Sequence, residues 1–125
     1  MLDQTAEATI RAAAEGYCIA LHNADADFLD DLCHENFAMA TVQPDGTQHF
    51  FTKESFVARA RARDPFSGEP SFKILSVDID PEMAMVKLWV DMAPRRFCDH
   101  LGFFKVGDDW KLISKLFRTA DGPSI

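Results

Sequence analysis

The sequence has few cysteines and no paired arrangement of them. The three cysteines among 125 residues, Cys18, Cys33 and Cys98, form no C-x-x-C pair, and an odd number does not suit a disulfide framework. Reduced thiols are typical of intracellular proteins. The N-terminus also lacks the basic start and apolar core of a signal peptide. No apolar run approaches the roughly 20 residues that span a bilayer. We therefore expect a cytoplasmic protein without a membrane segment.

Positive charge is also scarce. The chain has 13 Lys and Arg against 20 Asp and Glu, which gives a net charge of −7. Nucleic acids and anionic membrane surfaces both require a basic face on their partner. The one basic cluster, formed by Arg59, Arg61 and Arg63, is short. We expect no nucleic-acid partner and no membrane partner.

Motifs for phosphate, metal and nucleophilic chemistry are missing. The chain has no Gly-rich phosphate loop, nucleophile elbow or Walker motif. The histidines show no ligand spacing. Cys98, Asp99 and His100 cannot all bind one ion, because adjacent strand residues point to opposite faces. We expect no metal and no cofactor.

Apolar residues, in contrast, are plentiful. They make up 47% of the chain and include 11 Phe. A chain of this length forms one domain, residues 1–125, that buries a core without disulfides or metals. Apolar residues beyond those needed for the core could line a cavity or a subunit interface.

The periodicity of these residues predicts an α+β fold. Helices are expected over residues 3–22, after an Asp25 cap and after a Thr52 cap. Strands are expected over residues 37–42, 47–51, 72–79, 83–92, 95–106 and 110–118. Residues 119–125 show no pattern and are expected to fray. Segregated helices and mainly antiparallel strands indicate α+β, with a curved sheet whose concave face holds the three helices around a pocket.

The last two strands carry charge among apolar residues. A three-residue loop would place Asp99 and Lys115 diagonally on one face, about 7 Å apart at the backbone. The two-residue loop that Gly107-Asp108 permits would place them on opposite faces. A shared face would contain Phe97, Leu101, Phe103, Ile113 and Phe117. Burying charged groups among these apolar side chains costs free energy unless the charges are paired. The pair would either bind or polarise a ligand, or form a structural salt bridge.

Several stretches carry a resemblance to a known family. They are residues 17–25, Cys33-His34-Glu35-Asn36, Asp99-His100-Leu101 and residues 107–115. The chain resembles the NTF2-like (SnoaL-like, cystatin-like cone) superfamily over nearly its whole length, and within it the putative lumazine-binding group. Gly107-Asp108 replaces the more usual Asp-Gly order, and His100 stands where an aromatic is common. The resemblance implies a mixed, mostly antiparallel sheet and a homodimer formed through that sheet.

The superfamily includes isomerases, dehydratases, polyketide cyclases, transport factors and many proteins with no known activity, so the fold says little about function. In its ketosteroid isomerases a first-helix Tyr donates a hydrogen bond and a first-strand carboxylate is the base. Tyr17 matches the first role. The base position falls near Thr41, and residues 38–43 contain no carboxylate, so that mechanism is not expected here.

The candidate ligand-binding residues are Tyr17, His34, Asp99, Phe103, Lys115 and Phe117. We expect them to surround a small, flat and partly apolar ligand. His34 follows the second helix, a position that rims the cone in this superfamily. Two alternatives stay open. One is a cofactor-independent isomerase, dehydratase or cyclase that uses His34 or Asp99 for proton transfer. The other is a dimeric structural or interaction module without a catalytic role.

Overall fold

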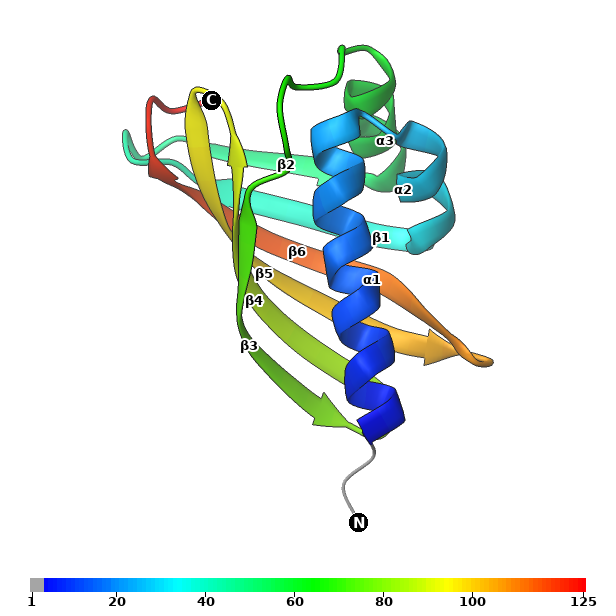
Figure 1. Ribbon diagram of the computed structural model, residues 1–125. Coiled ribbons are helices and arrows are strands. Elements are labelled where there is room, and N and C mark those ends of the chain that lie inside the picture. Colours follow the sequence, from blue (N-terminus) through cyan, green and yellow to red (C-terminus); the bar gives the residue numbers. More distant parts are fainter. Residues whose placement is uncertain (1–3) are drawn as a thin grey trace.

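The structure is a computed structural model that describes residues 4–125, so the expected first helical residue, Asp3, lies outside the described residues. It contains three helices and six strands (Figure 1). Their bounds are α1 Gln4–Asn23, α2 Ala26–Leu32, β1 Cys33–Val42, β2 Gln48–Thr52, α3 Lys53–Arg61, β3 Phe72–Asp80, β4 Met83–Met92, β5 Arg95–Val106 and β6 Asp109–Asp121.

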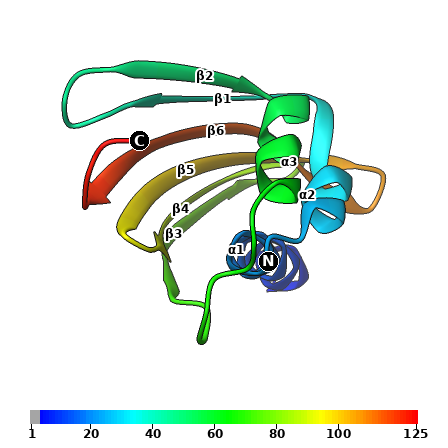
Figure 2. The same ribbon diagram turned by 90° about the horizontal axis from the view of Figure 1, so that it is seen from above.

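The six strands form one curved sheet in the order β2-β1-β6-β5-β4-β3. Neighbouring strands are antiparallel except for β1 and β6, which are parallel. Viewed from above, the sheet bends around the helices (Figure 2). The predicted α+β fold, with its mixed and mostly antiparallel curved sheet, is confirmed.

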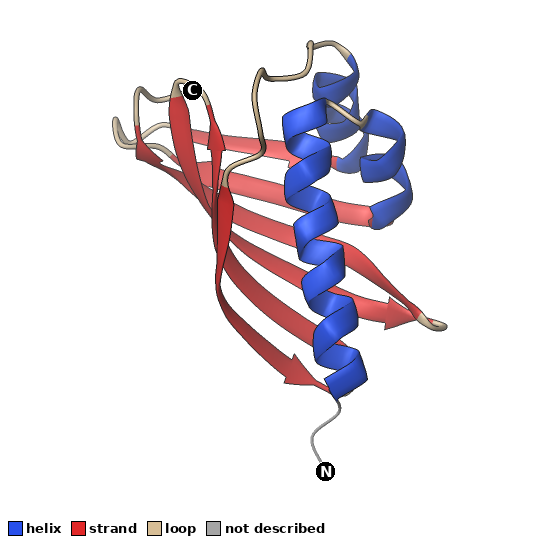
Figure 3. Ribbon diagram, viewed as in Figure 1, coloured by secondary structure: helices blue, strands red, loops and turns tan. Residues whose placement is uncertain are grey.

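Helix α1 crosses the concave face of the sheet, while α2 and α3 lie together beyond the start of β1 (Figure 3). Ile10, Ala14, Tyr17 and Leu21 recur at steps of three and four and are all buried. This spacing places them on one side of the helix, which therefore packs against the sheet.

The two shorter helices begin at the predicted caps. The Asp25 carboxylate accepts a hydrogen bond from the Phe28 amide. Thr52 and Ser55 form a reciprocal capping box at the start of α3. These bonds satisfy amide groups that the first helical turn leaves free.

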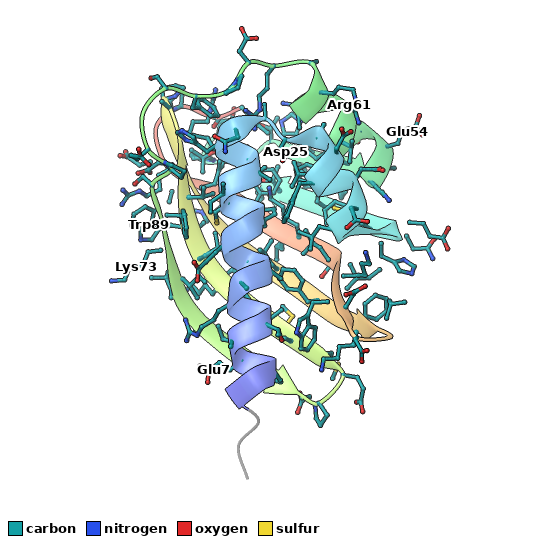
Figure 4. The ribbon with its side chains drawn as sticks, turned by 45° about the vertical axis from the view of Figure 1, so that its right-hand side comes forward. Glu7, Asp25, Glu54, Arg61, Lys73 and Trp89 are labelled. Carbon is teal, nitrogen blue, oxygen red and sulfur yellow. The ribbon has the colours of Figure 1, made fainter. Side chains whose placement is uncertain are left out.

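Strand β4 shows the predicted alternation. Val86 and Leu88 are buried, whereas Lys87 on the opposite face is exposed. Trp89 lies directly opposite Lys73 on β3. Both side chains project away from α1 (Figure 4). The two faces of the sheet are thus distinct, with the core on the helical side.

The prediction that residues 119–125 fray is wrong. Strand β6 continues to Asp121, and the buried Thr119 hydroxyl donates to the Gln43 side chain at 2.6 Å. The Ile125 amide donates to the same Gln43 oxygen at 3.2 Å. The Arg95 guanidinium donates to the carbonyls of Pro123 and Ser124 at 2.8 and 3.1 Å. The tail is therefore packed against the β4–β5 turn.

Among the described residues, no helix is long and apolar enough to cross a membrane.

Candidate functional site

Three polar side chains meet inside the core between α1 and the sheet. The Tyr17 hydroxyl donates to Asp99 Oδ2 at 2.6 Å. The Lys115 ammonium lies 3.8 Å from the same oxygen, and the two side chains are 6% and 0% exposed. Tyr17 comes from α1, Asp99 from β5 and Lys115 from β6, so the tertiary fold assembles the cluster.

A β-bulge explains how Asp99 and Lys115 share a face. The turn between β5 and β6 has two residues, Gly107 and Asp108, since Val106 pairs with Asp109. Gly107 has a φ of 64°, a conformation that favours glycine at the first position of such a turn. By itself this register would separate the two charges.

The register then shifts by one residue. Phe103 pairs with Leu112, whereas Gly102 pairs with Ser114, so Ile113 is the extra residue of a bulge. The shift places Leu101 opposite Lys115. The expectation that a two-residue loop separates the charges was therefore wrong, and so was the placement of Ile113 on the inner face, where Leu112 is fully buried.

Burial shifts the pKa values of Tyr17 and Lys115. Desolvation, followed by the charge of Asp99, raises the pKa of Tyr17 well above its usual range. The phenol is thus held as a hydrogen-bond donor. Desolvation lowers the pKa of Lys115, and the attraction of Asp99 partly offsets this effect.

Each charged group in the cluster keeps unused bonding capacity. In the part of the chain that the structure describes, Asp99 Oδ1 is buried without a hydrogen-bond partner. The Lys115 ammonium instead lies among aromatic rings. It is 4.7, 5.0 and 5.3 Å from the ring centroids of Phe117, Phe56 and Tyr17. Cation–π attraction compensates part of its lost hydration.

Lys115 also borders a cavity of about 400 Å³. This volume falls in the range of roughly 300–1,000 Å³ that is typical of ligand pockets. The cavity lies between α3, the sheet, the β4–β5 turn and the C-terminal tail. Its aromatic walls are Phe51, Phe56, Phe66, Phe97 and Phe117. A larger surface depression of about 600 Å³ lies beside α2 and α3, but its lining contains no residue of the buried cluster.

The predicted site residues fall into three groups. Lys115 and Phe117 line the cavity. Tyr17 and Asp99 are fully buried beneath Lys115, and Phe103 is 1% exposed within the core. None of these last three is among the residues that line the cavity.

His34 lies outside the cavity. Strand β1 begins at Cys33, four residues before its predicted start, and Cys33 takes the buried position. His34 therefore faces away from the core. The Nδ1 atom of His34 accepts a hydrogen bond from the Asn36 amide at 3.0 Å. The His34 ring packs edge-on against the Phe104 ring, with 5.3 Å between the ring centroids. The structure does not bring His34 to Asp99.

Three further cavity-lining residues, Arg59, Arg63 and Arg95, were not predicted as site residues from the sequence. The position of Arg59 could have been predicted from its spacing in the sequence. Arg59 follows Phe56 by three residues on α3 and therefore shares its helical face. No comparable pattern marks Arg95, whose place depends on the β4–β5 turn.

The two buried cysteines, Cys18 and Cys33, are poorly suited to nucleophilic chemistry. All three are free thiols. Burial raises the pKa of Cys33 to about 12 and raises that of Cys18 further. Such thiols are poor nucleophiles at neutral pH. Within residues 4–125, no group of three or more His, Cys, Asp or Glu side chains could hold a metal ion.

Solved structures define the class of this fold. The chain is 23% identical to an NTF2-like protein of unknown function from Silicibacter pomeroyi, with a TM-score of 0.86 and coverage of 95% of this chain and 99% of the other. An NTF2-like protein of unknown function from Shewanella baltica gives 18% identity, a TM-score of 0.86 and coverage of 98% and 99%.

A ketosteroid isomerase-like protein from Erwinia carotovora atroseptica gives 14% identity, a TM-score of 0.70 and coverage of 92% and 96%. The chain thus has the NTF2-like fold. The family model described as putative lumazine-binding matches residues 5–118, and the chain belongs to that family. Among curated proteins none matches.

Proposed function

We propose that this protein binds a small, partly apolar molecule in the cavity that Lys115 borders. The observation that carries the proposal is a cavity of about 400 Å³ with aromatic walls and a single buried ammonium group. Aromatic walls suit a flat apolar body, and one charged group fixes the orientation of a ligand. The family description points to small-molecule binding as well.

The cluster beneath the cavity supports this role. Asp99 lies 3.8 Å from the Lys115 nitrogen and opposes the lowering of the Lys115 pKa by burial, and Tyr17 holds Asp99 by a hydrogen bond of 2.6 Å. The ammonium is thereby fixed in position before a ligand arrives. Preorganised groups of this kind reduce the ordering cost of binding.

Native mass spectrometry of gently purified protein tests the proposal. We expect extra mass that leaves on denaturation, and we expect Ala60→Phe to reduce it. Ala60 is 4% exposed and lines the cavity from α3, so a ring at this position fills the space. Met92→Trp fills it from β4 and serves if the first variant folds poorly. Ligand retained at full occupancy by both folded variants would contradict the proposal.

Catalysis is a second candidate. The observation in its favour is the unpartnered Oδ1 of Asp99, which could accept a proton. Against it, Asp99 is 0% exposed and is not among the residues that line the cavity. His34, the other candidate base, lies elsewhere. We therefore place binding ahead of an isomerase, dehydratase or cyclase activity.

We also propose that the outer face of the sheet pairs with a second copy of the chain. Met83, Met85 and Leu116 are between 52% and 58% exposed on this face. They lie on β4 and β6, on either side of β5. A homodimer would cover them. Sedimentation of Met85→Lys and of Leu116→Lys tests this, since each added charge should favour the monomer. A wild-type monomer at micromolar concentration would contradict the proposal.

A further inference from the structure

We infer that the cavity selects an organic anion, a molecule with a flat apolar body and a carboxylate or similar group. The inference rests on the proposed function and adds the charge of the ligand. Four cationic side chains line the cavity, Arg59, Arg63, Arg95 and Lys115. No Asp or Glu is among its described lining residues. This concentration of positive charge stands out in a chain with a net charge of −7.

The cavity arginines also lack carboxylate partners. Among the described residues, no acidic oxygen lies within 4.0 Å of the guanidinium groups of Arg59, Arg63 or Arg95. Other arginines of the chain do have such partners, in the pairs Arg11–Glu7, Arg61–Asp27 and Arg96–Asp91. The positive charge at the cavity is therefore available to a ligand.

The buried acid below the cavity does not cancel this charge. Asp99 lies 3.8 Å from the ammonium of Lys115, so these two groups balance each other. The guanidinium groups of Arg59, Arg63 and Arg95 therefore supply the positive charge of the cavity. Arg59 is exposed and Arg63 and Arg95 are half-buried, and a cavity lined by charges of one sign attracts an opposite charge.

The guanidinium groups lie beside apolar walls. The Arg59 group is 5.1 Å from the ring centroid of Phe51, and the Arg63 group is 5.0 Å from that of Phe66. A ligand that reaches them places its anionic end next to an aromatic surface. This arrangement suits an aromatic or alicyclic acid better than a fully hydrated ion.

The arginines keep donors for such a ligand. A guanidinium has five N–H groups in a planar fork that matches a carboxylate. Arg95 uses two of its nitrogens on the tail carbonyls, and Arg63 donates to the carbonyls of Leu21 and Asp64. Within the described chain, the side chain of Arg59 has no hydrogen bond or ion pair, and its guanidinium lies over the Phe51 ring.

Titration calorimetry with 2-naphthoate and 2-naphthamide tests the inference. The two probes have nearly the same shape and differ in charge. We expect the wild-type protein to bind naphthoate at least about tenfold more tightly, which is the usual effect of one charge-assisted hydrogen bond. The preference should weaken as salt is added.

Arg59→Gln is the variant of choice, because it breaks no internal hydrogen bond. It should reduce the preference for naphthoate severalfold. Arg61→Gln is the matched control on the same helix. Arg61 projects outward from α3 (Figure 4), pairs with the exposed Asp27 and does not line the cavity. The Arg61→Gln variant should keep the wild-type preference for naphthoate over naphthamide.

The outcomes separate the two proposals. Equal affinity for both probes, or a preference that Arg59→Gln and Arg61→Gln reduce alike, would overturn the anion inference and leave the apolar pocket intact. Absence of binding by either probe would count against the proposed function and the inference together. Naphthoate preference that Arg59→Gln weakens, and that Ala60→Phe abolishes along with binding, would support both.

Discussion

Replacing Lys115 by Met tests whether the buried cluster is held together by charge. Methionine fills similar space without the ammonium. Asp99 would then be a fully buried carboxylate whose described hydrogen bonding is limited to the one from Tyr17. Removing one partner of a buried pair typically costs about 3–5 kcal/mol, because the other charge is left uncompensated.

This cost is a large part of the roughly 5–15 kcal/mol that stabilises most domains. For a chain of this size it corresponds to a fall in melting temperature of about 10–20 °C. Urea unfolding at neutral pH, followed by the fluorescence of the buried Trp110 and by circular dichroism, measures it. Two probes are needed to show that unfolding stays two-state.

The double variant Asp99→Asn/Lys115→Met is the matched control. It leaves no charge in the core, so it should be more stable than Lys115→Met alone. A loss below about 1 kcal/mol for Lys115→Met, or a double variant less stable than either single one, would refute the reasoning.

Three further predictions follow from the contacts. Tyr17→Phe removes the hydrogen bond to Asp99 and should cost about 1.5–3 kcal/mol by urea unfolding; a loss near zero would mean that the bond contributes nothing. Gly122 has a φ of 95°, and a Cβ there would meet the Pro94 carbonyl, so Gly122→Ala should loosen the tail and weaken 2-naphthoate binding. Gly46→Ala is its control, with a φ of 87° and open space, and equal effects would disprove the role of the tail. Burial raises the pKa of Cys33 from 9.0 to about 12, so the unfolded thiol ionises first and stability should fall as pH rises from 9.0 toward 12, by up to about 1.4 kcal/mol per pH unit. Cys33→Ala should make that slope shallower, while Cys18, whose pKa burial also raises, keeps its own contribution; an unchanged slope would contradict the assignment.

The sequence was sufficient for most of the elements, because each of them leaves a local pattern. The alternation of Val86 and Leu88 with exposed residues marked β4, and the Asp25 and Thr52 caps marked the starts of α2 and α3. These signals depend on neighbours a few residues apart. Such local patterns can be recognised in the sequence without knowledge of the tertiary fold.

The features that failed depend on distant residues. Ile113 is apolar like its neighbours, so nothing local shows that it is the extra residue of a bulge. The order of the tail depends on Gln43, which is 76 positions from Thr119. His34 was misplaced relative to the core because β1 begins at Cys33 rather than at Phe37. A shift in the start of a strand changes which residues face inward.

The candidate site was predictable in part. A shared face for Asp99 and Lys115 was one of two outcomes that the sequence allowed, but it arises from a two-residue loop followed by a bulge, which neither predicted register contained. The cavity itself was not predictable in detail, since α3, the β4–β5 turn and the tail all contribute to its walls. Its charge emerges only when these separate segments are assembled.

An NMR titration of the protein with 2-naphthoate, observed through backbone amide signals, tests most directly whether this cavity is the binding site. We predict that the signals of Arg59, Ala60 and Phe117, which line the cavity, shift with one common affinity. The signal of Trp89, on the outer face, should stay in place (Figure 4). Shifts confined to the outer face, or no shifts at saturating ligand, would contradict the claim that this cavity is the binding site.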